Sequence, residues 1–196
     1  MARANGCHPA QRPPARRRLA AHAGSWYDAR AGVLGHELGA WLGAAKDAAS
    51  DSDPPAGAPV RAIIAPHAGY RFSGETAAHA YAALSAARSR VRRVFVLGPS
   101  HHWFTRRCAL SQMTSYETPL GDLAIDADTY AALRETGKFD TMSKQVDEDE
   151  HSIEMHLPYI VKCVEPGTRY VCARSASAPI GVRACSVPSA ARGAPR

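Results

Sequence analysis

The chain has 196 residues and a mass of 20.9 kDa, a size that fits one domain. Its 45% hydrophobic and 21% charged residues are typical of a globular protein, and no apolar run approaches the roughly 20 residues that a membrane helix needs. We therefore expect a single globular domain without a membrane span.

The net charge of +6 is concentrated at the two ends of the chain. Residues 1–18 and 166–196 each contain five Arg and no acid, which leaves 14 Lys and Arg against 18 Asp and Glu in residues 19–165, a net charge of −4. A nucleic-acid-binding protein needs a basic patch on its folded part. The acidic body therefore predicts no nucleic-acid partner.

The cysteines fit a reducing compartment. There are five of them, an odd number, and no Cys-x-x-Cys pair occurs among Cys7, Cys108, Cys163, Cys172 and Cys185. This pattern argues against both a disulfide framework and a cysteine zinc module. The first 20 residues also lack the apolar stretch of a secretory signal. We expect a cytoplasmic or nuclear protein.

The predicted elements begin with an amphipathic helix over residues 29–46, where apolar residues recur at three-and-four spacing. The apolar run Val60–Ala65 predicts a buried strand that stops at Pro66. A second helix is expected over residues 73–87 with Ser73 as its cap, and a second buried strand over Arg93–Leu97. Strand, helix and strand in this order form a βαβ unit, so the prediction is an α/β fold with a mostly parallel sheet and flanking helices.

Farther along the chain the pattern predicts shorter elements. These are strands at Cys108–Ser111 and Leu123–Ile125, a helix at Ala127–Glu135, and a long helix at Glu148–Lys162 that is kinked at Pro158. Residues 51–59, rich in Pro and Gly, are predicted to form a surface linker. Residues 1–18 and 166–196 are predicted to be disordered, because neither shows a periodic apolar face.

Histidines follow both predicted strands of the βαβ unit. His67 comes after Val60–Ala65, and His101 and His102 come after Arg93–Leu97. The carboxyl ends of parallel strands share one edge of a sheet, which is where α/β proteins bind ligands. Imidazole is a good ligand for iron, copper and zinc. The pattern favours a metal site at this edge, although surface histidines in loops would give the same pattern.

A mononuclear metal site usually needs a third protein ligand. The nearest candidates lie in the acid-rich run from Asp147 to His156, where His151 and Glu154 are three residues apart and would share one helix face. The simpler interpretation of this run is a solvent-exposed first helical turn. We treat His151 and Glu154 as neighbours of the site rather than as ligands.

The segment Gly69–Gly74 lies just before the second predicted helix and contains Arg71. Free backbone N–H groups at a helix start can hold an anion such as a phosphate, and Arg71 would assist. An ordinary helix cap explains the same residues. No glycine-rich nucleotide motif and no Gly-x-Ser-x-Gly elbow occurs in the chain.

Four strings of this sequence resemble the Memo family in order and spacing. They are His22–Tyr27 (HAGSWY), Arg61–Tyr70 (RAIIAPHAGY), Leu97–His102 (LGPSHH) and Asp147–Tyr159 (DEDEHSIEMHLPY). The resemblance covers about residues 19–165 and corresponds to the N-terminal half of a family member. It implies an incomplete fold similar to that of the class III extradiol dioxygenases.

The resemblance also implies a site. The family's first two metal ligands fall on His67 and His101, with iron or copper as the metal, and its pocket tryptophan falls on Trp26. From their places in the sequence, Arg71 in the loop before the second helix and His102 next to His101 are also expected to line the ligand pocket. The third ligand of the animal proteins, a cysteine, lies outside the matching stretch, so metal binding by this chain is expected to be weak or absent.

For function, the resemblance implies a signalling protein that acts in cell motility and cytoskeletal signalling downstream of receptor tyrosine kinases, with a phosphotyrosine peptide as a partner. The alternatives are a non-haem iron dioxygenase-like enzyme and a non-functional fragment.

Overall fold

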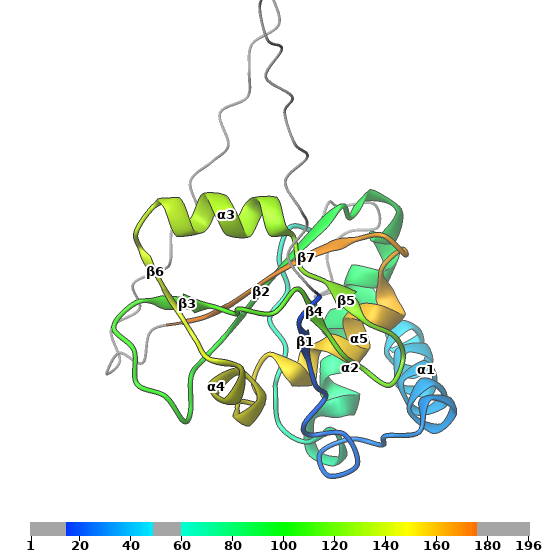
Figure 1. Ribbon diagram of the computed structural model, residues 1–196. Helices are drawn as coiled ribbons and strands as arrows, with labels where there is room; N and C mark the ends of the chain where they lie inside the picture. Colours follow the sequence, from blue (N-terminus) through cyan, green and yellow to red (C-terminus); the bar gives the residue numbers. More distant parts are fainter. Residues whose placement is uncertain (1–14, 49–59, 176–196) are drawn as a thin grey trace, which may run out of the picture.

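A computed structural model describes residues 15–48 and 60–175 as a mixed α/β structure with two small sheets (Figure 1). The larger sheet has the strand order β2 (Arg93–Gly98), β7 (Arg169–Arg174), β3 (Cys108–Leu110) and β6 (Phe139–Thr141). Its β2–β7 and β3–β6 pairs are parallel, whereas β3 and β7 are antiparallel. The smaller sheet joins β1 (Arg17–Arg18), β4 (Ser115–Tyr116) and β5 (Leu123–Ala124). The sheets are therefore mixed rather than mostly parallel.

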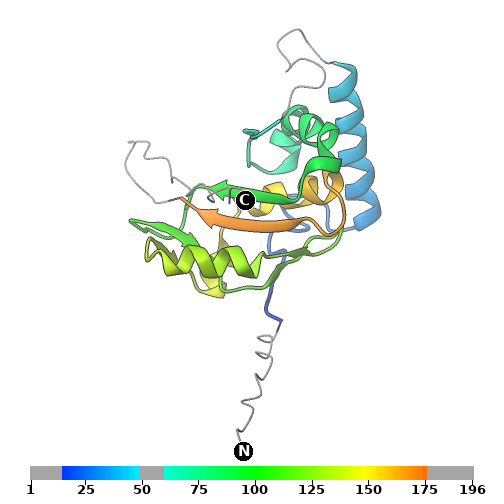
Figure 2. The same cartoon turned by 90° about the horizontal axis from the view of Figure 1, so that it is seen from above.

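Helices pack on both sides of the larger sheet (Figure 2). On one side lie α1 (Ala31–Asp47), α2 (Tyr70–Ala86) and α5 (Leu157–Cys163), and on the other lies α3 (Ala127–Glu135). A short helix, α4 (Lys144–Asp149), and two 3₁₀ turns, η1 (Arg88–Arg90) and η2 (Glu154–His156), complete the helical elements of the described residues. The main core lies under the first group of helices, and a smaller cluster lies under α3.

The helices with the clearest local signals are confirmed. The structure places α1 within two residues of the predicted bounds, with Leu34, Leu38 and Leu42 buried. The bounds of α3 match the prediction, because the Asp126 carboxylate caps its first turn by accepting a hydrogen bond from the Thr129 N–H (3.0 Å).

The prediction for α2 was wrong at its start. The helix begins at Tyr70, three residues earlier than expected, because the Ser73 hydroxyl donates to the Ala68 carbonyl (2.8 Å) instead of capping a later turn. Within the helix, a Cβ added at Gly74 would overlap the Trp41 ring of α1. The two helices can therefore pack this closely only with glycine at this position.

The predicted βαβ unit is wrong in its first strand. Residues Val60–Ala65 pair with no strand of the described residues, and Ile64 is 96% exposed. The parallel partner of β2 is β7 instead, which lies in the stretch that was expected to be disordered. An apolar run shows that a segment suits burial, but it does not show which strand will pair with it.

The predicted long helix at residues 148–162 is divided. After α4 the chain becomes extended at Glu150 (φ −93°, ψ 131°), and helical structure resumes only at η2 and α5. Pro158 lies in the first turn of α5, where its missing N–H costs nothing, so it helps to start a helix and does not kink one.

Both chain ends contribute more structure than predicted. Arg17–Arg18 form β1, and residues 166–175 form a turn and β7, so these parts of the two end segments are ordered. The linker prediction at 51–59 and the remainder of both ends lie outside the described residues. Among the residues that the structure does describe, no helix is long and apolar enough to cross a membrane.

Candidate metal centre

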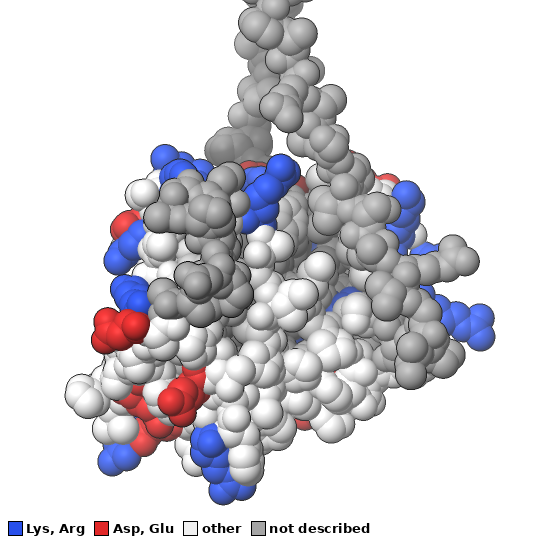
Figure 3. Space-filling view, turned by 180° about the vertical axis from the view of Figure 1, so that it is seen from behind, with Lys and Arg blue, Asp and Glu red and all other residues white. Residues whose placement is uncertain are grey.

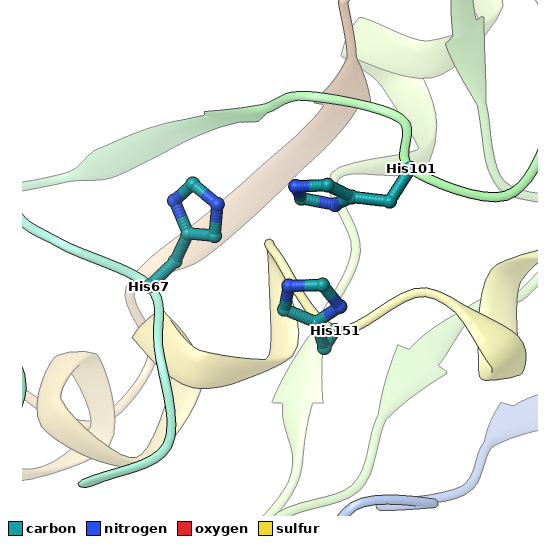
Figure 4. Close-up of side chains that lie close together, drawn as sticks. All are labelled: His67, His101 and His151. Carbon is teal, nitrogen blue, oxygen red and sulfur yellow. The ribbon is translucent and has the colours of Figure 1, made fainter. Parts of the chain in front are cut away.

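Three histidines from separate parts of the chain meet at one point (Figure 4). His67 precedes α2, His101 follows β2, and His151 lies between α4 and η2. One ligand atom from each lies within 4.8 Å of the others, close enough to contact a single ion. The rings of His101 and His151 stack with centroids 4.3 Å apart, and the His67 ring lies 5.3 Å from that of His101. The two histidines singled out in the sequence do come together.

His151 offers the third nitrogen of this cluster. The sequence placed it beside the site, on a helix face shared with Glu154. The extended backbone at Glu150 removes His151 from α4 and places its ring between Trp26 (centroids 4.4 Å apart) and His101. Among the described residues, the cluster is therefore made of imidazoles alone.

Glu150 orients two of these rings. Its carboxylate accepts hydrogen bonds from the His101 backbone N–H (2.6 Å) and from the His101 Nδ1 (2.8 Å). The His151 Nδ1 lies 3.5 Å from the same carboxylate. A carboxylate facing Nδ1 favours the tautomer with its proton there, which leaves the lone pair on Nε2 of His101 available to a metal.

The expectation of a solvent-exposed acid run was wrong for three of its acids, Asp147, Glu150 and Glu154. Asp147 is fully buried and Glu150 is 1% exposed, whereas Asp149 is exposed. The buried acids face two buried arginines: Arg18 lies 3.2 Å from Asp147, and Arg174 lies 3.1 Å from Asp147 and 3.2 Å from Glu150. Opposite charges offset the cost of removing these groups from water.

Glu154 holds the Trp26 loop against the site. Its buried carboxylate accepts hydrogen bonds from the His22 backbone N–H (2.9 Å), the His22 Nδ1 (2.8 Å) and the Tyr27 hydroxyl (2.8 Å), and pairs with Arg18 (2.7 Å). Burial alone would raise the pKa of Glu154, but the hydrogen bonds from His22 and the charge of Arg18 lower it below its usual range. Glu154 therefore supports the wall of the site as an ionised group.

The other two pocket residues expected from the sequence lie farther out. His102 is exposed, and its ring centroid is 6.3 Å from that of His151. Arg71 is also exposed, with its guanidinium 4.4 Å from the centre of the Phe72 ring. It lies in the first turn of α2, next to Tyr70, whose N–H donates to the Trp26 carbonyl (2.9 Å).

Two histidines of the cluster, His67 and His151, are suited to bind a metal at neutral pH because burial favours their uncharged form. Burial, reinforced by the neighbouring histidines, lowers the pKa of His151 to about 4 and also lowers the pKa of His67. Metal ligation requires neutral imidazole, so these shifts reduce competition from protons.

Acid should destabilise the fold through His156, which is half-buried and shares a hydrogen bond with the Tyr81 hydroxyl (2.8 Å). Burial lowers its pKa to about 4, against about 6.5 in an unfolded chain. Between these values the unfolded state binds more protons, so stability falls as the pH falls from about 6.5 to about 4, while above this window both states are neutral. We expect a loss of at most about 3 kcal/mol from this residue. Urea unfolding at several pH values measures it.

The control for this prediction is His156→Gln, which removes the titrating ring. Its free energy of unfolding should depend less on pH over the same window than that of the unaltered chain. Equal slopes for the two proteins would contradict the role given to His156.

Comparison with known proteins identifies relatives. The family model described as Memo-like protein matches residues 18–173. The chain is 54% identical over 148 residues to Protein MEMO1 of Danio rerio and 51% identical over 148 residues to Protein MEMO1 of Homo sapiens, alignments that cover 76% of this chain and 46% of each relative. Protein memo-1 homolog of Caenorhabditis elegans is 46% identical over 145 residues, covering 74% of this chain and 39% of the relative.

The chain thus spans less than half the length of these relatives. The matched stretch ends at residue 173, beyond the expected boundary at 165, which agrees with the order seen in β7. The resemblance therefore extends eight residues beyond the boundary expected from the sequence. A family model that covers residues 18–173, including all three clustered histidines, shows that the chain belongs to the Memo family.

Proposed function

We propose that this chain is a metal-binding signalling protein whose metal is held by His67, His101 and His151. The convergence of three ligand atoms within 4.8 Å carries the proposal. Imidazole suits iron, copper and zinc, and three protein ligands leave further coordination positions open. Iron or copper is the metal that we favour, because the chain belongs to the Memo family. When bound, such a metal would supply redox chemistry at this position.

The test is metal titration of the chain with Fe(II), Cu(II) and Zn(II), comparing single alanine variants of His67, His101 and His151. Loss of a residue that hydrogen-bonds to a metal ligand typically lowers metal affinity by roughly 10–100-fold. Loss of a ligand itself should lower the affinity by more than that in each of the three variants. His79→Ala is the control, because His79 is exposed on α2 outside the cluster. Unchanged affinity in the His67 and His101 variants would overturn the assignment of ligands.

The biological role that we propose is signalling in cell motility and the cytoskeleton downstream of receptor tyrosine kinases, in the cytoplasm. Membership of the Memo family supports it. The site also has an aromatic wall, because Trp26 lies against His151 with ring centroids 4.4 Å apart. We propose a phosphotyrosine peptide as the partner, with Trp26 contacting the ring and Arg71 the phosphate.

Calorimetric titration with a phosphotyrosine peptide and its unphosphorylated form tests this partner. The phosphorylated peptide should bind more tightly, and Arg71→Ala should remove at least half of the difference in binding free energy between the two peptides. Lys138→Ala, which removes one exposed positive charge near the end of α3, should preserve that difference. Equal affinities for the two peptides would remove the phosphate from the proposal.

A further inference from the structure

A groove of about 770 Å³ separates the segment Val60–Ala65 from strand β2. All residues of the segment Val60–Ala65 line the groove, and so do all residues of β2 except Gly98. Residues of α2 and α5, including Tyr81, Leu84 and Ile160, complete this lining. Figure 3 shows the molecule from behind, where a broad area carries no Lys, Arg, Asp or Glu. The groove therefore lies between two extended stretches of backbone.

Within the part of the chain that the structure describes, the edge of β2 that faces away from β7 pairs with no other strand. The carbonyls of Arg92 and Gly98 accept hydrogen bonds from the backbone N–H groups of Arg169 and Ser175, at or just beyond the ends of β7. Backbone N–H and C=O groups point to alternate sides along a strand, so those of Val94 and Val96 also face β7. The backbone N–H and C=O groups of Arg93, Phe95 and Leu97 face away from β7. β2 is the last strand on that side of the described sheet. Such an edge is a template for another strand.

The lining of the groove indicates what could bind there. It is mostly apolar, and Phe95, Leu97 and Ile64 are among the most exposed large hydrophobic residues of the described chain. The lining includes Arg61, Arg90, Arg92 and Arg93, and none of its described residues is an acid. Arg61, Arg90 and Arg92 form no ion pair with an acid of the described residues. An apolar segment with an acidic residue at one end would complement this lining.

The volume fits one strand. A strand rises about 3.3 Å per residue, lies about 4.8 Å from its neighbours and belongs to a layer about 10 Å thick, so five residues fill roughly 800 Å³. A second copy of the chain would have to pair its own β2 edge here and bring its sheet with it, and the segment Val60–Ala65 obstructs that approach. A single inserted strand has no such obstruction.

We propose that this groove accepts one extended strand of about five residues, apolar along its length and acidic beside Arg61 and Arg92, supplied by the part of a longer family member that lies beyond the matched stretch. That source is favoured because the alignments leave more than half of each relative unmatched. Binding would occur by β-strand addition, in which backbone hydrogen bonds give affinity and side-chain contacts give specificity.

The experiment co-expresses this chain with the part of human MEMO1 that follows the matched stretch, and also fuses that part after residue 175 in a single polypeptide. Hydrogen exchange of the peptide covering β2 is compared with that of the chain alone. In both formats the exchange of β2 should slow at least tenfold, and the co-expressed pair should purify as a 1:1 complex by light scattering. The fusion keeps the test valid if the separate human part is insoluble.

Two variants at one position isolate the backbone contribution. Phe95→Pro removes an N–H that faces the groove and leaves the β7 ladder intact, whereas Phe95→Ala keeps that N–H. The proline variant should weaken the complex at least tenfold more than the alanine variant. Unchanged exchange of β2 in the fusion, equal effects of the two variants, or protection of β2 by dimerisation of the chain alone would each overturn the proposal.

Discussion

Asp147→Ala is expected to destabilise the fold by about 3–5 kcal/mol, the cost of breaking a buried ion pair by removing one partner. The Asp147 carboxylate is fully buried and accepts hydrogen bonds from Arg18 (3.2 Å), Arg174 (3.1 Å) and the Tyr116 hydroxyl (2.8 Å). Both arginines are themselves fully buried. Without the carboxylate, two guanidinium groups would lose a partner in a place where water cannot replace it.

Urea unfolding measures this loss against the 5–15 kcal/mol by which ordinary domains are stable. The matched control is Asp149→Ala, two residues farther along the same helix, where the carboxylate is exposed and contacts the Gln145 amide (2.7 Å). The control should change the free energy of unfolding by no more than about 0.5 kcal/mol. If Asp147→Ala lost less than about 1 kcal/mol, the buried network would have no part in stability.

This network also explains why the ends of the domain could not be predicted. Arg18 and Arg174 occur in stretches with no acid and no periodic apolar face, which is typical of disorder. Their partners lie far away in the sequence, because both arginines pair with Asp147, and Arg174 also lies 3.2 Å from Glu150. A charged side chain is rarely buried unless an opposite charge lies beside it in the fold. When that opposite charge is distant in the sequence, local composition carries no information about it.

The elements that were predicted correctly depend on local signals. The bounds of α3 follow from the cap at Asp126, and α1 follows from the spacing of Leu34, Leu38 and Leu42. Strand pairing is different, because Val60–Ala65 is as apolar as β2 and yet pairs with no described strand. Propensity identifies a segment that would suit a sheet, while tertiary packing decides whether it enters one.

Two of the three clustered histidines, His67 and His101, could be predicted from the sequence as ligands of the candidate site, and the third, His151, could not. His67 and His101 were predicted to meet at one edge of a parallel sheet, and they do lie together, although Val60–Ala65 pairs with no described strand. The place of His151 depends on the extended backbone at Glu150, which interrupts what reads as a continuous helix. One signal for that interruption was available: Pro158 is favoured in the first turn of a helix, which argues for a new helix near Leu157.

Glu150→Gln is expected to lower the metal affinity of the histidine cluster by roughly 10–100-fold, the effect typical of losing an outer partner of a ligand. The carboxylate accepts from His101 at both its backbone N–H (2.6 Å) and its Nδ1 (2.8 Å), and it lies 3.5 Å from the His151 Nδ1. A neutral amide cannot accept on both of its ends, so it holds the His101 ring less firmly and makes the ring a weaker electron donor.

Competition with a chelator measures the affinity, and the absorption spectrum of a bound Co(II) probe reports whether the ligand geometry has changed. The matched control is Glu148→Gln in the same acid run, because the Glu148 carboxylate accepts from the Leu19 N–H (2.7 Å) and forms no contact with the three histidines. Near-UV circular dichroism confirms that both variants keep their packed core. Because Glu150 also lies 3.2 Å from Arg174, Glu150→Gln should lower the stability of the fold to some extent. If Glu150 had a structural role alone, however, the metal affinity of the folded protein would not change. Equal metal affinities for Glu150→Gln and Glu148→Gln would therefore show that the buried carboxylate supports the fold and does not position the ligands.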